Sequence, residues 1–109
     1  MDELTTLDQL TGLLAATHDR VVIFKHSTQC SISEAAHGEV MAAFAEFPAA
    51  ADWVLLDLLE HRDVSNQVAK LLGIKHESPQ FIVLEKGVVK SVLNHRAIKR
   101  AALQTLFRV

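Results

Sequence analysis

The sequence of 109 residues predicts an α/β fold in which helices flank a mixed four-stranded sheet. Three observations lead to this prediction. Apolar stretches with strand character alternate with stretches of helical spacing, which is typical of parallel strands joined by crossover helices. The last two strand-like stretches are separated only by Glu85-Lys86-Gly87, a connection typical of an antiparallel hairpin. The length suits one hydrophobic core, so residues 1–109 are expected to form a single domain.

The first helix and the first strand are expected before residue 25. Thr6 and Gln9 have the spacing of a capping box, in which each side chain bonds the other residue's backbone amide. The leucines of segment 7–14 recur at helical spacing, so the helix is expected to reach about Thr17. Residues 21–24 form an unbroken β-branched and aromatic run, which favours a central strand covered on both faces.

The second helix is expected to follow a polar segment and to end at Pro48. Ala36, Val40, Phe44 and Phe47 are spaced by four, four and three residues, as on the buried side of a helix.

The rest of the chain continues the alternation. Residues 53–59 form the next strand, parallel to the first, and residues 64–72 form a helix that stops at Gly73. Residues 81–84 and 88–92 form the hairpin strands. The apolar positions of the closing helix are Ile98, Ala102 and Leu106. Two parallel strands followed by a hairpin, with helices on both faces, make a thioredoxin-like arrangement.

Charge and hydropathy exclude two classes of partner. Eleven Lys and Arg against thirteen Asp and Glu give a net charge of -2, without the basic stripe that nucleic-acid binding requires. The longest apolar run, Val40 to Ala45, is too short to span a membrane, and no basic stretch leads into an apolar signal segment. We therefore expect a cytoplasmic protein with no nucleic-acid or membrane partner.

The single cysteine, Cys30, is the most informative residue, because it rules out an intramolecular disulfide. It lies between the first strand and the second helix, where free backbone amides and the helix dipole favour a thiolate, the nucleophilic form. A capping-box pattern at residues 31–34 also allows the helix to begin at Ser31. Lys25 and His26 could add positive charge. The alternative is a buried, unreactive thiol.

Ser33 decides which redox chemistry is open to Cys30. Redox enzymes of this architecture commonly carry a second cysteine three residues after the first, and here that position holds a hydroxyl. A serine can donate a hydrogen bond to the thiolate, but it cannot displace a bound partner by forming a disulfide. An external thiol must therefore regenerate Cys30, which is monothiol chemistry. One cysteine and dispersed histidines lack the paired spacing of zinc ligands, so no metal site is predicted.

Three segments resemble one family at matching order and spacing. Residues 25–33, Lys-His-Ser-Thr-Gln-Cys-Ser-Ile-Ser, are similar to the active-site segment of the monothiol bacilliredoxins, the YtxJ- or BrxC-type family of thioredoxin-fold proteins. The similarity extends to residues 61–66 and 73–80. It implies that Cys30 takes bacillithiol from mixed disulfides on protein cysteines and is then regenerated by a low-molecular-weight thiol. Bacillithiol is then a co-substrate, with no bound cofactor. One departure is Ser31, where the family has proline.

The resemblance also implies roles for residues beside the cysteine. In thioredoxin-like folds the proline equivalent to Pro79 is cis and faces the cysteine. The backbone of the preceding residue, Ser78, then pairs with an extended substrate. His26 is expected to contribute to substrate binding at the end of its strand.

The carboxylates of bacillithiol need a basic partner, and the loops after parallel strands open at one end of the sheet. Arg62, alone or with Lys25 or His76, is the candidate. A solvated arginine at the sheet end is the alternative. Asp57 is interpreted as a polar strand end rather than a proton-handling carboxylate.

Two other functions remain open at this point. One is a more general monothiol, glutaredoxin-like reductase that uses another low-molecular-weight thiol. The other is a non-catalytic thioredoxin-fold adaptor. An iron-sulfur carrier is a further variant, because a lone cysteine at a helix start can share a cluster across a dimer.

Overall fold

The fold is a five-stranded mixed sheet with helices on both faces, described by a computed structural model over residues 1–15 and 17–108. The strand order is β1-β3-β2-β4-β5. Strands β2 (Arg20–His26) and β3 (Asp52–Asp57) are parallel, while β4 (Gln80–Glu85) pairs antiparallel with β2 and with β5 (Val88–Asn94). The predicted parallel pair and C-terminal hairpin are therefore present.

The fifth strand is β1 (Asp2–Glu3), which the sequence did not predict. It pairs in parallel with β3 at the sheet edge, and the amide of Leu4 donates to the carbonyl of Leu55 at 2.8 Å. Leu4 is buried directly after it. Two exposed acidic residues carry no strand pattern of their own, so only the pairing with β3 defines this strand.

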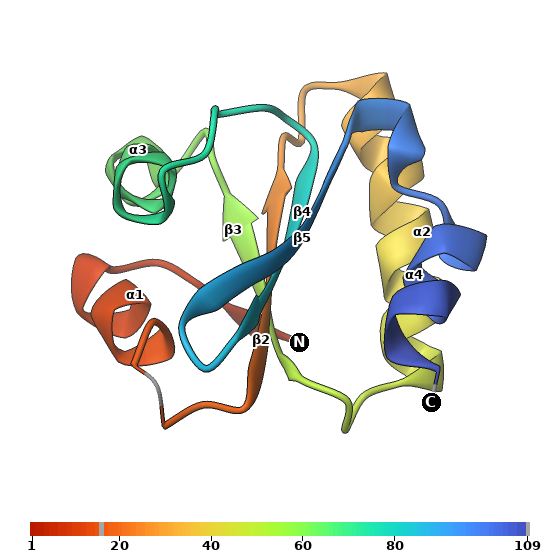
Figure 1. The fold of residues 1–109 in the computed structure, drawn as a ribbon. Coiled ribbons are helices and arrows are strands. Elements are labelled where there is room, and N and C mark those ends of the chain that lie inside the picture. The colour runs from red at the N-terminus through yellow and green to blue at the C-terminus, as the bar shows by residue number, and fades with distance from the viewer. Residues whose placement is uncertain (16, 109) are drawn as a thin grey trace.

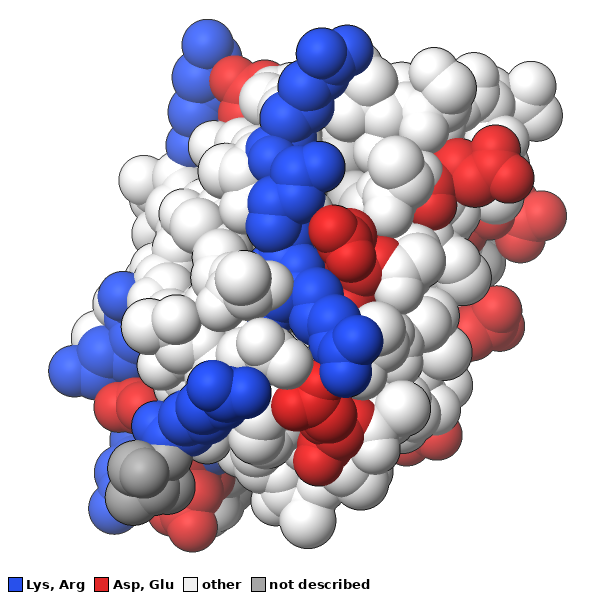
Figure 2. Space-filling model, turned by 90° about the vertical axis from the view of Figure 1, so that its right-hand side faces the viewer, with Lys and Arg blue, Asp and Glu red and all other residues white. Residues whose placement is uncertain are grey.

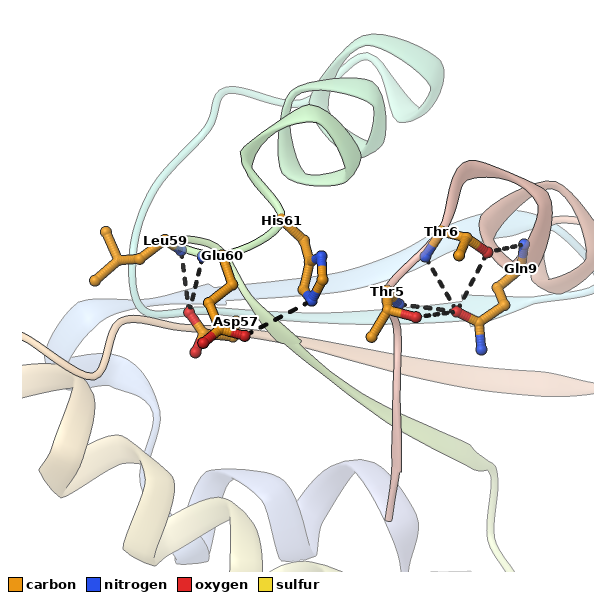
Figure 3. Close-up of polar contacts among 7 residues, drawn as sticks. All are labelled: Thr5, Thr6, Gln9, Asp57, Leu59, Glu60 and His61. Carbon is orange, nitrogen blue, oxygen red and sulfur yellow. Dashed lines mark hydrogen bonds and ion pairs between the residues drawn. The ribbon is translucent and has the colours of Figure 1, made fainter.

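Helix α1 (Leu7–Leu13) begins with the predicted capping box. Figure 3 shows the box: the amide of Gln9 donates to Thr6 Oγ1 at 3.1 Å, and Gln9 Oε1 accepts from the amide of Thr6 at 3.1 Å. The helix ends earlier than expected, and the predicted extension includes Ala16, which lies outside the described residues. Figure 1 places α1 beside α3 (Arg62–Leu72), which ends at Gly73 with the left-handed φ of 65° that glycine adopts without strain.

Helices α2 (Ser31–Glu46) and α4 (Arg100–Phe107) cover the opposite face of the sheet (Figure 1). The second helix ends just before the predicted stop at Pro48. The buried positions of α4 are Leu103 and Phe107, whereas the predicted Ala102 and Leu106 are only half-buried. The prediction was one residue out of phase, because Ile98 precedes the helix in an extended conformation and does not share its spacing.

The sheet separates two hydrophobic cores. Alternate residues of β2 point to opposite faces, as strand geometry requires. Val22 and Phe24 pack toward α2 and α4, while Val21 and Ile23 pack toward α1 and α3. No helix in the described ranges combines the length and apolar character needed to cross a bilayer.

Candidate active site

The candidate site lies at the carboxyl ends of the parallel strands, where β2 leads into α2. Cys30 is half-buried and occupies the N-cap of α2, with extended backbone angles of φ -124° and ψ 125°. Its carbonyl accepts from the amide of Glu34 at 3.0 Å, which is the first hydrogen bond of the helix. The helix therefore begins at Ser31, but the predicted capping box at residues 31–34 does not form, because Cys30 and not Ser31 occupies the N-cap.

Cys30 has the position at which serine or aspartate usually caps a helix. No side chain supplies that cap here. The amides of the first turn have no carbonyl partner within the helix, so they favour a negatively charged atom at the N-cap. Cys30 therefore presents its sulfur at the end of the helix where the backbone amides are free.

Ser33 is fully buried, and its hydroxyl holds the turn that carries the cysteine. Ser33 Oγ accepts from the amide of Ser27 at 2.9 Å and lies 2.8 Å from His26 Nδ1. These contacts use the hydroxyl to close the segment between β2 and α2. In the described structure the side-chain hydrogen bonds of Ser33 run to His26 and Ser27, not to Cys30.

Replacing Ser33 with alanine should lower the free energy of unfolding by about 1–2 kcal/mol, because the buried amide of Ser27 loses its acceptor. Urea unfolding measures this change. Ser31→Ala is the matched control, since Ser31 is exposed on the same turn and should change stability by less than about 0.5 kcal/mol. Equal losses in the two variants would contradict the assigned contact.

His26 forms part of an aromatic stack beside the cysteine turn. Its ring lies 5.6 Å from that of Phe24 and 4.8 Å from that of His37 on α2, measured between centroids. Burial lowers the pKa of His26, and the nearby His37 lowers it further. His26 is therefore neutral at neutral pH and joins Ser33 Oγ through a hydrogen bond between uncharged groups.

The Ser78–Pro79 peptide bond is cis, as the resemblance implied. Its position follows from the sheet register. Gln80 on β4 lies opposite Lys25 on β2, so Ser78 and Pro79, which precede Gln80, lie at the same end of the sheet as His26. Pro79 is buried and Ser78 is half-buried. Ser78 Oγ is buried without a hydrogen-bond partner among the described residues.

Lys25 does not add its charge to the cysteine side of the sheet. Its side chain is fully buried, on the face covered by α3, where Nζ donates to the carbonyl of Ser65 at 3.2 Å. Nζ also lies 3.2 Å from His76 Nδ1. The expectation that Lys25 supports the thiolate was wrong because consecutive strand residues face opposite sides, and His26 takes the side toward α2.

Arg62 is the first residue of α3, and its side chain is exposed. Burial lowers the pKa of His76, the charges of Lys25 and Arg62 lower it further, and the charge of Glu77 opposes them. These three basic residues therefore form one group at the α3 side of the site, with Glu77 beside it. Within that group the side chain of Lys25 is fully buried, so it cannot reach a carboxylate of a ligand. Arg62 and His76 are its accessible members.

Asp57 closes the turn between β3 and α3. Its Oδ1 accepts from the amides of Leu59 at 3.1 Å and Glu60 at 3.4 Å, as Figure 3 shows. This contact supports the interpretation of Asp57 as a polar strand end and explains why the strand stops before the predicted residue 59.

Across residues 1–15 and 17–108, no three His, Cys, Asp or Glu side chains are grouped to hold a metal ion.

Comparison with protein families identifies the chain. The model of the monothiol bacilliredoxin BrxC family matches residues 2–103. The chain belongs to that family. Membership makes it a thioredoxin-fold protein of an oxidoreductase family, and its single cysteine is consistent with the monothiol type.

Solved structures give the same fold for this BrxC-family chain. A protein described as an oxidoreductase with a thioredoxin fold is 28% identical, covers 95% of this chain and 90% of its own, and superposes with a TM-score of 0.86. Mitochondrial thioredoxin 3 of Saccharomyces cerevisiae is 18% identical, with a TM-score of 0.77 and coverage of 98% and 92%. Fasciola hepatica thioredoxin is 14% identical, with a TM-score of 0.74 and coverage of 98% and 96%. The predicted thioredoxin-like fold is therefore correct, with β1 as its additional strand.

Sequence reasoning missed His37 as a neighbour of the site. A signal for it existed, because His37 lies four residues after Ser33 and therefore on the same side of α2. The sequence also gave only a weak indication that Lys25 is buried. The residue continues an apolar strand, but a lysine at a strand end is normally exposed.

Proposed function

We propose that this protein is a monothiol oxidoreductase that removes bacillithiol from mixed disulfides on protein cysteines. The Cys30 thiolate attacks the bacillithiol sulfur, a new disulfide forms between Cys30 and bacillithiol, and the substrate cysteine leaves as a thiolate. The observation that carries the proposal is the pairing of a lone cysteine at a helix N-cap with a buried serine three residues later.

Regeneration then requires a second thiol from solution. Its thiolate attacks the bacillithiol sulfur of the adduct, forms a disulfide with bacillithiol and releases Cys30 as a thiolate. Ser33 has no sulfur with which to compete. Its proposed role is to hold the cysteine turn through Ser27 and His26. His26 supplies a neutral, partly apolar surface for the substrate.

Two further residues are proposed to orient the mixed disulfide. The backbone of Ser78, before Pro79, pairs with the extended chain of the modified protein. Arg62 receives a carboxylate of bacillithiol through a charge-assisted hydrogen bond. The support for Arg62 is its exposed position in the basic group at the carboxyl end of the parallel strands.

The test is the rate at which the protein removes bacillithiol, compared with glutathione, from one cysteine of the same carrier protein. The proposal predicts faster removal of bacillithiol, and Arg62→Ala should lower that rate by roughly fivefold. Lys86→Ala, at the far end of the hairpin, is the control. Equal rates with both thiols would replace the bacillithiol assignment with a general monothiol reductase. An unchanged rate of bacillithiol removal in Arg62→Ala would show that Arg62 does not bind bacillithiol.

A further inference from the structure

A hollow of about 350 Å³ is lined by the residues that directly follow Cys30, and it lies on the face of the sheet covered by α2 and α4. One wall is the first turns of α2, beginning with Ser31 and Ile32, the two residues that follow Cys30. The other wall is the 3₁₀ turn η1 (His95–Ala97) and the link to α4. This second wall includes His95, Arg96 and Lys99.

The charge of the hollow is one-sided. Arg96 and Lys99 are both exposed, and within the described part of the chain neither forms an ion pair. The nearby Arg100, by contrast, is bound by Glu46. No acidic residue lines the hollow. Figure 2 shows the wider setting: on the face covered by α2 and α4, Lys and Arg side chains form a long band with Asp and Glu side chains beside it. A protein with a net charge of -2 thus presents a basic surface beside its nucleophile.

The η1 wall of the hollow is hydrogen-bonded to the loop around Ser78 and Pro79, which is proposed to pair with substrate. The amide of His95 donates to the carbonyl of Pro79 at 2.9 Å, and His95 Nε2 lies 2.8 Å from Glu77 Oε2. His95 has a positive φ of 53°, which a non-glycine residue adopts only where its surroundings hold it. The backbone contact therefore places the η1 turn, which includes Arg96, beside the loop that carries Ser78 and Pro79.

We propose that this hollow binds aspartate or glutamate side chains that flank the modified cysteine of a protein substrate. This inference rests on the proposed function and adds a preference among protein substrates to it. Arg96 and Lys99 supply charge-assisted hydrogen bonds to the carboxylates, and the basic band steers acidic segments toward Cys30. An extended band fits an extended acidic segment better than it fits a compact small molecule.

The test uses two peptides that differ only in charge. Each carries one cysteine in a mixed disulfide with the neutral thiol 2-mercaptoethanol, flanked by Asp and Glu in one peptide and by Asn and Gln in the other. The wild type should react with the acidic peptide roughly tenfold faster at low salt, and most of this preference should disappear at about 300 mM salt. The double variant Arg96→Gln/Lys99→Gln should lose most of this preference.

Lys90→Gln is the matched control, because Lys90 is an exposed lysine on β5 outside the hollow. It should keep the preference for the acidic peptide. Retention of that preference in the double variant would overturn the proposal. A second result would also overturn it: the double variant reacts more slowly with bacillithiol disulfides, while its rates with both peptides stay the same as those of the wild type. The hollow would then recognise the charge of the small thiol and not that of the peptide. Because 2-mercaptoethanol replaces bacillithiol, a failed bacillithiol assignment leaves the peptide preference measurable.

Discussion

The variant Cys30→Ala should transfer bacillithiol at a rate on the order of a hundredfold or more below that of the wild type. Cys30 is the only sulfur nucleophile in the chain, and the first turn of α2 leaves its amides free to stabilise a thiolate. Without the sulfur no covalent intermediate can form. Release of bacillithiol from a modified carrier protein, followed by mass spectrometry of the carrier, measures the rate.

Folding of the variant must be checked separately. Cys30 is half-buried at a helix N-cap, where serine is a favoured residue, so Cys30→Ser provides a second inactive variant that keeps a capping hydroxyl. Both variants should unfold within about 1 kcal/mol of the wild type. Undiminished removal of bacillithiol by either variant would contradict a role for Cys30 as nucleophile.

Replacing Lys25 with methionine should stabilise the protein by roughly 2 kcal/mol at pH 7. Burial lowers the pKa of Lys25 from 10.5 to about 8. That difference corresponds to roughly 3 kcal/mol spent on keeping the charge buried at neutral pH. Methionine removes this cost but also loses the hydrogen bond to the Ser65 carbonyl, worth about 1 kcal/mol.

The same residue makes stability depend on pH. Below pH 8 Lys25 is protonated in both states; between pH 8 and 10.5 the unfolded chain holds the proton and the folded protein does not. The free energy of unfolding therefore rises with pH across this window, by up to roughly 3 kcal/mol from this residue. The groups facing Nζ are the Ser65 carbonyl and His76, whose ring is neutral in this range.

Urea unfolding at pH 7, 9 and 10.5 measures the effect as the difference between the wild type and Lys25→Met. The advantage of the variant should shrink as the pH rises and should reverse slightly at pH 10.5. Lys90→Met, an exposed lysine on β5, is the control and should follow the wild type at every pH. A constant difference between wild type and Lys25→Met would show that the buried charge does not set the stability.

The sequence was sufficient for the features that local chemistry determines. The capping box at Thr6, the stop at Gly73 and the hairpin around Gly87 each depend on a few neighbouring residues, and each is present. The central strands could be read from unbroken apolar runs. The position of Cys30 at the start of α2 followed from the order of these elements.

Features that depend on distant partners could not be read from the sequence. Strand β1 exists because β3 offers a free edge, not because Asp2 and Glu3 favour a strand. The buried position of Lys25 depends on the carbonyl of Ser65, which lies 40 residues away in sequence. The hollow beside Cys30 joins two segments about 60 residues apart in sequence, so its charge became visible only in three dimensions.

The most direct test of the central claim is the intact mass of the wild-type protein after mixing with one equivalent of a bacillithiolated carrier, with no other thiol present. We predict that the protein gains the mass of one bacillithiol, that the carrier loses it, and that peptide mapping places the adduct on Cys30. The adduct should persist until a free thiol is added, because Ser33 cannot resolve it. A carrier that loses its bacillithiol while Cys30 stays unmodified, or a carrier that keeps it, would contradict the account.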